Sequence, residues 1–236
     1  MLDMRYFKEE TRYLEHAWEV FGDYFVLKHN FLSQYNQIPT QERKNLFLMI
    51  VSKYKFLVRD GEYNLITRGR YHYVDYLDRT YKFISIMSLI EAMFADEEYV
   101  DFYQWLMMKK RKKHIFPIAD AKTLDDLYRE YKLKFGAKKT VKFFSELDDA
   151  AQDFLATRIR IDNDQKPAEI IAQKLYIIRS EFVHQARLIL EFNDGLMFSK
   201  REGDVMYSML SLPDLQLIFE HGLLHHFCIT PDNRKI

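Results

Sequence analysis

The sequence has little of several features that direct a chain toward a specialised class. It holds one cysteine, Cys228, among 236 residues, which excludes an internal disulfide and fits a reducing compartment. We expect this thiol to be buried as a small apolar residue. Seven glycines and five prolines are few for this length, and no internal repeat or low-complexity segment is present. The composition therefore favours a packed globule over disorder.

Net charge is also lacking, as are long apolar runs. The 35 lysines and arginines balance 35 acidic residues, so no global positive field attracts a polyanion. No apolar run approaches the roughly 20 residues that a membrane span needs, and the first ten residues are too polar and acidic for a signal peptide. We expect a soluble intracellular protein that resides in the cytoplasm and does not engage a membrane.

What is present is apolar periodicity at helical spacing, in a chain that is 48% hydrophobic and 16% aromatic. The pattern predicts an all-α protein with an N-terminal helical segment, residues 1–70, and a helical bundle, residues 71–236. Asp60 and Gly61 form a turn signal, with a β-hairpin over residues 53–67 as the alternative. Residues 191–204 read as a loop or short hairpin. Helices are expected over residues 3–25, 40–58, 71–94, 101–106, 120–131, 141–161 and 167–193, and from Ser211 and Pro213 onward.

The helix over residues 167–193 carries the groups with the clearest chemical potential. Ile171, Leu175 and Ile178 begin an apolar stripe, and Asp162, Asn163 and Asp164 are candidate caps before Pro167. Arg179 and His184 border the opposite half, about 140° apart in projection. They cannot grip one small atom together, but a second copy related by a two-fold axis would complete a site.

An arginine and a histidine in such a cleft suit cleavage of a phosphodiester. Imidazole, with an ordinary pKa near 6.5, exchanges a proton with a ribose 2′-hydroxyl near neutrality. The guanidinium holds two phosphate oxygens and stabilises charge in the transition state. This chemistry needs no metal or other cofactor. The alternative from spacing alone is structural, with Arg179 in a salt bridge and His184 packed against its neighbours.

The sequence allows two interpretations for each of two further groups. Glu91, on the apolar helix over residues 71–94, is either solvated at the rim or paired with Arg179. The basic block Lys109, Lys110, Arg111, Lys112 and Lys113 is either a solvated helix end or a patch for an RNA backbone. A second basic cluster spans residues 134–142. His221 and His225 lie one helical turn apart, but no third ligand is placed nearby, and we expect no metal site.

The run LYIIRSEFVH resembles the signature of HEPN domains, in particular the Apea-like branch. Leu175, Tyr176, Arg179, Ser180, Val183 and His184 stand at the positions of its apolar-Tyr-x-x-Arg-Ser-x-x-apolar-His pattern. FISIMSLIEAMFA is similar to the apolar helix that the family places upstream, with Glu91 at its acidic position. The resemblance covers about residues 71–227 and implies an antiparallel helical bundle that forms a homodimer.

The same resemblance implies a metal-independent endoribonuclease, with Arg179 on the phosphate, His184 as acid and base, and Ser180 and Glu91 in support. Such enzymes leave a 2′,3′-cyclic phosphate and a 5′-hydroxyl, and some act as toxins, paired with an antitoxin, or as defence effectors. The alternative is a catalytically inactive module for dimerisation, partner binding or nucleotide binding. That alternative is favoured by zero net charge, by Ser180 where many active members carry Asn, Asp or His, and by Gln185 where the family often has Gly.

Overall fold

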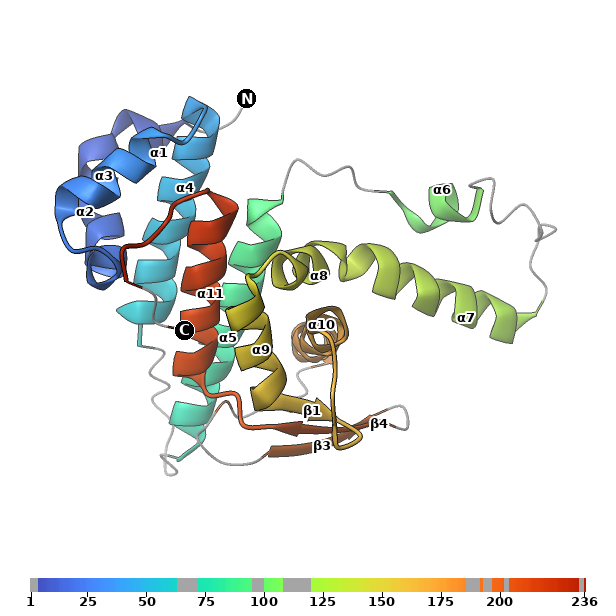
Figure 1. Ribbon diagram of the computed structural model, residues 1–236. Coiled ribbons are helices and arrows are strands. Elements are labelled where there is room, and N and C mark those ends of the chain that lie inside the picture. Colours follow the sequence, from blue (N-terminus) through green and yellow to red (C-terminus); the bar gives the residue numbers. More distant parts are fainter. Residues whose placement is uncertain are drawn as a thin grey trace.

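The computed structural model describes residues 4–62, 72–94, 100–107, 120–185, 192, 197–201, 204–233 and 236. Figure 1 shows a bundle of helices with a small sheet at one end and a helical arm that projects to one side. The protein is mainly helical, as the periodicity predicts. Among the described helices, none is long and apolar enough to cross a membrane.

The N-terminal helices begin the bundle. α1 (Arg5–Lys8) and α2 (Glu10–Phe21) fill the range expected to be helical, whereas α3 (Lys28–Asn36) was not expected. α4 (Gln41–Tyr54) begins where the sequence predicts, because the Thr40 hydroxyl accepts a hydrogen bond from the Arg43 amide at 3.2 Å. The next turn, Lys55–Arg59, is π-helical, so the first strand of the alternative hairpin does not form. The second strand of that hairpin, within residues 63–67, lies outside the described residues.

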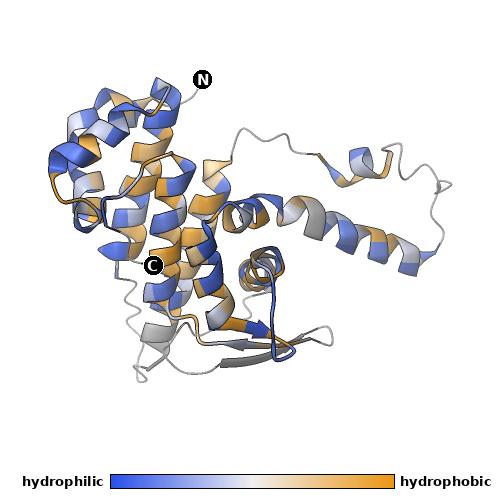
Figure 2. Ribbon diagram, in the orientation of Figure 1, coloured by the Kyte–Doolittle hydropathy of each residue, from blue (hydrophilic) through white to orange (hydrophobic). Residues whose placement is uncertain are grey.

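Two helices form the centre of the bundle. α5 (His72–Met93) buries Phe83, Ile86 and Ile90, as its continuous apolar run predicts. α11 (Leu212–His226) begins at Ser211, which exchanges hydrogen bonds with Asp214 in a capping box. Figure 1 shows α11 in front of α5, and Figure 2 shows apolar residues concentrated where these helices meet α4.

One core joins the N-terminal helices to the rest of the protein. A single cluster of buried side chains includes Phe47 of α4 together with residues of α5 and α11. Within it, Glu220 of α11 is 8% exposed and accepts hydrogen bonds from the hydroxyls of Tyr24 and Tyr54, each at 2.8 Å. Burial, the larger cause, and this carboxylate raise the pKa of Tyr54. The two expected segments therefore share one hydrophobic core and one buried polar link.

Beside the helices, the protein has a small four-stranded antiparallel sheet at one end of the bundle, which the prediction of an all-α protein did not include. The expected helix over residues 141–161 is divided into α8 (Lys138–Ser145), α9 (Asp149–Arg158) and β1 (Ile159–Ile161). Asp148 makes the break, since it is extended and caps α9 by accepting from the Ala151 amide at 2.9 Å. The strand order is β2-β1-β4-β3, with β2 Asp164–Gln165, β3 Met197–Arg201 and β4 Asp204–Ser208.

Turn chemistry explains the sheet. Asp162 and Asn163 have φ values of 55° and 66°, so these expected helix caps instead form the tight turn between β1 and β2. The Asp162 carboxylate also accepts from the Val205 amide of β4 at 2.8 Å. Of the loop or short hairpin expected over residues 191–204, the structure has a hairpin, but it lies later in the chain, because its second strand, β4, runs from Asp204 to Ser208. β4 also pairs with β1 across more than 40 residues of chain.

A second apolar cluster forms the arm, which comprises α6 (Phe102–Met107), α7 (Ala121–Tyr131) and the π-helical turn Lys132–Gly136. α7 confirms the helix expected over residues 120–131, and Asp120 caps it, accepting from the amides of Lys122 and Thr123. The buried residues of the cluster are Trp105, Leu106, Leu127 and Tyr131. In Figure 1, α7 continues the line of α8 away from the bundle.

His226, near the end of α11, predicts a pH dependence of folding stability. Burial, followed by the positive charges of Arg43, Lys142 and His225, lowers its pKa from 6.5 to about 4, while Glu146 lies 4.0 Å from Nδ1. The native state therefore resists the proton that the unfolded chain takes up, and stability falls as pH drops from 6.5 toward 4. The loss attributable to His226 is about 2–3 kcal/mol.

Urea unfolding of wild type and His226→Leu between about pH 7 and about pH 4 measures this contribution. The wild type is expected to lose more free energy of unfolding over this range than the variant does. Parallel pH profiles for the two proteins would contradict the assignment.

Candidate functional site

α10 (Ala168–Gln185) presents the residues of the sequence motif. It begins directly after Pro167, whose missing amide is not needed in a first helical turn. Ile171 and Leu175 are fully buried and Ile178 is 4% exposed, which confirms the predicted apolar stripe. The helix packs against α8, α5 and α9. The stripe residues after Gln185 that the pattern predicts lie outside the described residues.

Arg179 forms an ion pair with Glu91 of α5. Its Nη2 lies 3.2 Å from the Glu91 carboxylate, and the two side chains are 19% and 28% exposed. Of the two interpretations of Glu91, the structure therefore has the one in which it pairs with Arg179. The Nε of Arg179 is buried and has no hydrogen-bond partner among the described residues. Among the described residues, the guanidinium is thus held by the Glu91 carboxylate through Nη2, while its buried Nε–H makes no hydrogen bond.

The ion pair lies at a junction of three helices, α5, α8 and α10, and charged groups from all three affect one another there. Burial raises the pKa of Glu91, and the positive charges of Arg179 and of Lys139 on α8 oppose that rise. Tyr176, one turn before Arg179, has its pKa raised by burial and by Glu91. The junction therefore combines two cations, one carboxylate and one phenol in a partly dehydrated setting, where charge interactions are stronger than in water.

The approach of α10 to the base of the arm is unusually close. A Cβ atom on Gly136 would lie 2.6 Å from the Tyr176 hydroxyl oxygen, so a side chain at position 136 would displace the phenol. The lack of a side chain at Gly136 thus lets the arm begin directly beside the Glu91–Arg179 pair. Since Lys139 follows three residues later on α8, the base of the arm and the ion pair belong to one local structure.

His184 occupies the last described turn of α10 and is exposed, as is Val183, at 49%. Ser180 is half-buried. Five residues of helix separate Arg179 from His184 by about 7.5 Å along the axis and about 140° around it. Arg179 is turned toward α5, whereas the imidazole faces solvent. Within one chain the structure does not bring the two candidate catalytic groups together.

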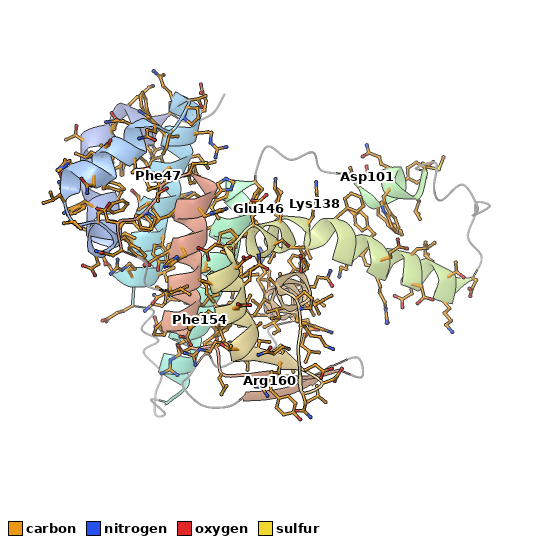
Figure 3. All side chains as sticks on the ribbon, viewed as in Figure 1. Phe47, Asp101, Lys138, Glu146, Phe154 and Arg160 are labelled. Carbon is orange, nitrogen blue, oxygen red and sulfur yellow. The ribbon has the colours of Figure 1, made fainter. Side chains whose placement is uncertain are left out.

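The basic residues predicted to contact RNA divide into two sets. Lys109, Lys110, Arg111, Lys112 and Lys113 lie outside the described residues. Part of the second basic cluster, residues 134–142, lies on α8, where Lys138 is exposed and Lys139 is near Glu91. Figure 3 labels Lys138 where α8 meets the arm.

The remaining candidate residues, two histidines of α11 and the cysteine after it, form no evident site. His221 packs edge-on against the Tyr24 ring at 5.4 Å, and His225 is exposed. In the described part of the chain, no group of three or more His, Cys, Asp or Glu side chains is arranged to hold a metal ion. Cys228 is exposed, so the expectation of a buried thiol is wrong. It follows the end of α11 with a φ of 57°, a left-handed conformation that directs the chain out of the helix.

Sequence reasoning missed two members of the junction. Tyr176 was noted as part of the motif, and its position one turn from Arg179 is a signal that could have marked it as a neighbour. Lys139 gave no such signal, because it comes from α8, and α8 meets α10 through packing that no local pattern specifies.

Comparison with protein-family models, with curated proteins and with solved structures finds no match for this chain.

The Glu91–Arg179 pair predicts a stability difference between a buried and an exposed ion pair. Glu91→Ala leaves a guanidinium that is four-fifths buried without its carboxylate, and this is expected to cost about 1–3 kcal/mol of unfolding free energy. The matched control is Asp125→Ala, which breaks the exposed Asp125–Arg129 pair of α7 and should change stability by less than about 0.5 kcal/mol. Urea unfolding measures both, and equal losses would contradict a structural role for Glu91.

Proposed function

We propose that the protein is a metal-independent endoribonuclease of the HEPN type that acts as a homodimer. The proposal is supported by the different surroundings of two residues on α10. Arg179 is oriented by Glu91 in a partly dehydrated junction, and His184 projects into solvent one and a half turns further on. His184 therefore lacks the packing role that the structural alternative gives it, whereas Arg179 has the salt bridge of that alternative.

The reaction is a transfer of the phosphoryl group within RNA. The His184 imidazole accepts the proton of the ribose 2′-hydroxyl, whose oxygen attacks the adjacent phosphorus. The bond from phosphorus to the 5′-oxygen of the next nucleotide breaks, and that oxygen leaves as a hydroxyl after it takes a proton from the protonated His184 imidazole. Arg179 stabilises the charge that grows on the non-bridging oxygens. The products are a 2′,3′-cyclic phosphate and a 5′-hydroxyl.

Two copies of the chain are needed for this geometry. In one chain Arg179 and His184 point about 140° apart, so neither reaches the same phosphate as the other. A two-fold contact that uses the end of α10 brings both pairs to one cleft. Val183 supports this contact, because an apolar side chain that is 49% exposed beside His184 gains from being covered.

A non-catalytic interaction module is the second candidate, and one observation favours it. The Arg179 guanidinium is already paired with Glu91 and its side chain is only 19% exposed. In this alternative Arg179 is structural, and the exposed end of α10 serves to bind a second copy or a partner protein. Toxin or defence activity belongs to the first candidate and has no role in the second.

Cleavage of single-stranded RNA in EDTA by wild type, His184→Ala and His225→Ala distinguishes the two. Wild type is expected to cleave, and His184→Ala to lose about 10²–10⁴-fold in rate, because it lacks the proton-transfer group. His225→Ala is the matched control, since it removes another exposed imidazole, on α11, and should retain wild-type activity. Absence of cleavage by wild type, or equal cleavage by wild type and His184→Ala, would leave the interaction module as the better account.

A further inference from the structure

The arm carries a pocket that the motif residues do not line. Its volume is about 450 Å³, and its walls are Phe102 of α6 with Ala121, Leu124, Asp125 and Tyr128 of α7. This volume lies within the range of pockets that hold small organic ligands. In Figure 1, α6 and α7 lie beside each other at the far side of the molecule from the N-terminal helices.

One wall of the pocket is aromatic, and other aromatic rings of the arm pack against that wall. The rings of Phe102 and Tyr128 meet edge to face at 5.3 Å and 80°. Phe102 also packs against the buried rings of Trp105 and Tyr131, at 5.8 Å and 5.3 Å. Tyr128 remains 42% exposed, although it stacks on Tyr131. A fixed, solvent-facing aromatic ring of this kind provides a platform on which a flat heterocycle can stack.

The polar groups around the rings suit a nucleobase with its phosphate. Asp125 is the one charged residue of the lining, and Arg129 holds its carboxylate at 3.0 Å. Two carboxylate oxygens accept from ring and amino N–H groups, which nucleobases present at their edges. Lys132 Nζ lies over one face of the Tyr128 ring, 5.2 Å from its centroid, so a cation is held at the stacking residue itself. Aromatic platforms flanked by cations are the means by which proteins bind single-stranded nucleic acids.

The pocket is connected to the candidate active site by a continuous ridge. α7, the turn Lys132–Gly136 and α8 follow one another along the chain, and α8 packs against α10. Tyr128 and Lys139 are eleven residues apart, on the order of 16 Å along a helix axis. A short stretch of single-stranded RNA covers such a span. Figure 3 shows the side chains of the arm, with Lys138 labelled at its base and Asp101 beside α6.

We propose that this pocket binds one unstacked base of a single-stranded RNA whose backbone continues along the ridge toward Arg179. The choice of RNA rests on the proposed ribonuclease function. The pocket then selects RNA that is free to present a base, and excludes paired bases, whose faces are covered by their neighbours. The Tyr128 ring supplies the stacking surface and Asp125 accepts hydrogen bonds from the edge of the base.

Binding is measured by fluorescence anisotropy with a labelled RNA of about ten nucleotides, the length of a short single-stranded binding site. All proteins carry His184→Ala, so that binding is read without cleavage. Tyr128→Leu keeps an apolar side chain but removes the ring, and is expected to weaken binding about tenfold. Tyr128→Phe keeps the ring and should bind like the parent. Leu124→Glu, a second variant at a position that is 40% exposed, adds a repelling charge to the pocket and should also weaken binding.

Two controls make the result specific. Tyr103→Ala removes a tyrosine of the same arm that is 64% exposed but does not line the pocket, and it should leave the affinity unchanged. An abasic strand of the same length retains the phosphates and should bind Tyr128→Leu and its parent equally. Circular dichroism confirms that each variant is folded.

The inference is overturned if the parent fails to bind RNA, if Tyr128→Leu and Leu124→Glu both bind as the parent does, or if the abasic strand binds as tightly as RNA. It is equally overturned if Tyr128→Leu changes self-association in sedimentation but not RNA affinity, since the pocket is then a contact between copies. Because cleavage is assayed separately on wild-type protein, base binding without cleavage refutes the ribonuclease alone. Cleavage that Tyr128→Leu does not affect, together with unchanged binding, refutes the pocket alone.

Discussion

The ion pair between Glu91 and Arg179 is the contact on which the account of this protein depends. It joins α5 to α10 across 88 residues of sequence, at 3.2 Å, with both side chains mostly withdrawn from water. A guanidinium in that position needs a carboxylate, and the carboxylate needs a cation, because either charge alone is costly in a partly dehydrated junction. The pair therefore holds the Arg179 guanidinium, to which the proposed function assigns the phosphate, against α5.

The proposed function depends on the side chains that this orientation leaves exposed. With Arg179 turned toward α5, the opposite side of the last turns of α10 carries His184 and Val183 into solvent. An imidazole beside an uncovered apolar side chain fits a surface that meets a second copy. Lys139 of α8 and Tyr176 of α10 complete the junction, and the aromatic pocket of the arm lies further along α7. A strand of RNA laid along the ridge would meet a stacking ring, then cations, then the guanidinium.

Local chemistry accounts for what the sequence could predict. Thr40, Asp120 and Ser211 each cap the helix that they were expected to begin, because a side-chain oxygen satisfies amides in the first turn whatever the rest of the fold does. The apolar stripe of Ile171, Leu175 and Ile178 is buried for a similarly local reason, the 3.6-residue period. Periodicity could not reveal the break at Asp148, since the pattern continues through the cap into β1.

The remaining features depend on contacts between distant residues. Asp162 and Asn163 suit a helix cap and a tight turn equally well, and the choice was made by the pairing of β1 with β4. Glu91 had two interpretations until α5 and α10 were placed together. Lys139 and the pocket residue Phe102 reach their sites from helices whose neighbours no short pattern specifies. The motif residues of the candidate site could thus be predicted from the sequence. The contacts that α8 and the arm make with them could not.

The central claim is that Arg179 and His184 promote attack by a ribose 2′-hydroxyl on the neighbouring phosphate. Mass spectrometry of the ends of RNA fragments, produced by the wild-type protein in EDTA, tests this claim most directly. The account predicts 2′,3′-cyclic phosphate and 5′-hydroxyl ends, since the attacking oxygen belongs to the RNA itself. Fragments with 3′-hydroxyl and 5′-phosphate ends, or RNA that remains intact, would contradict it.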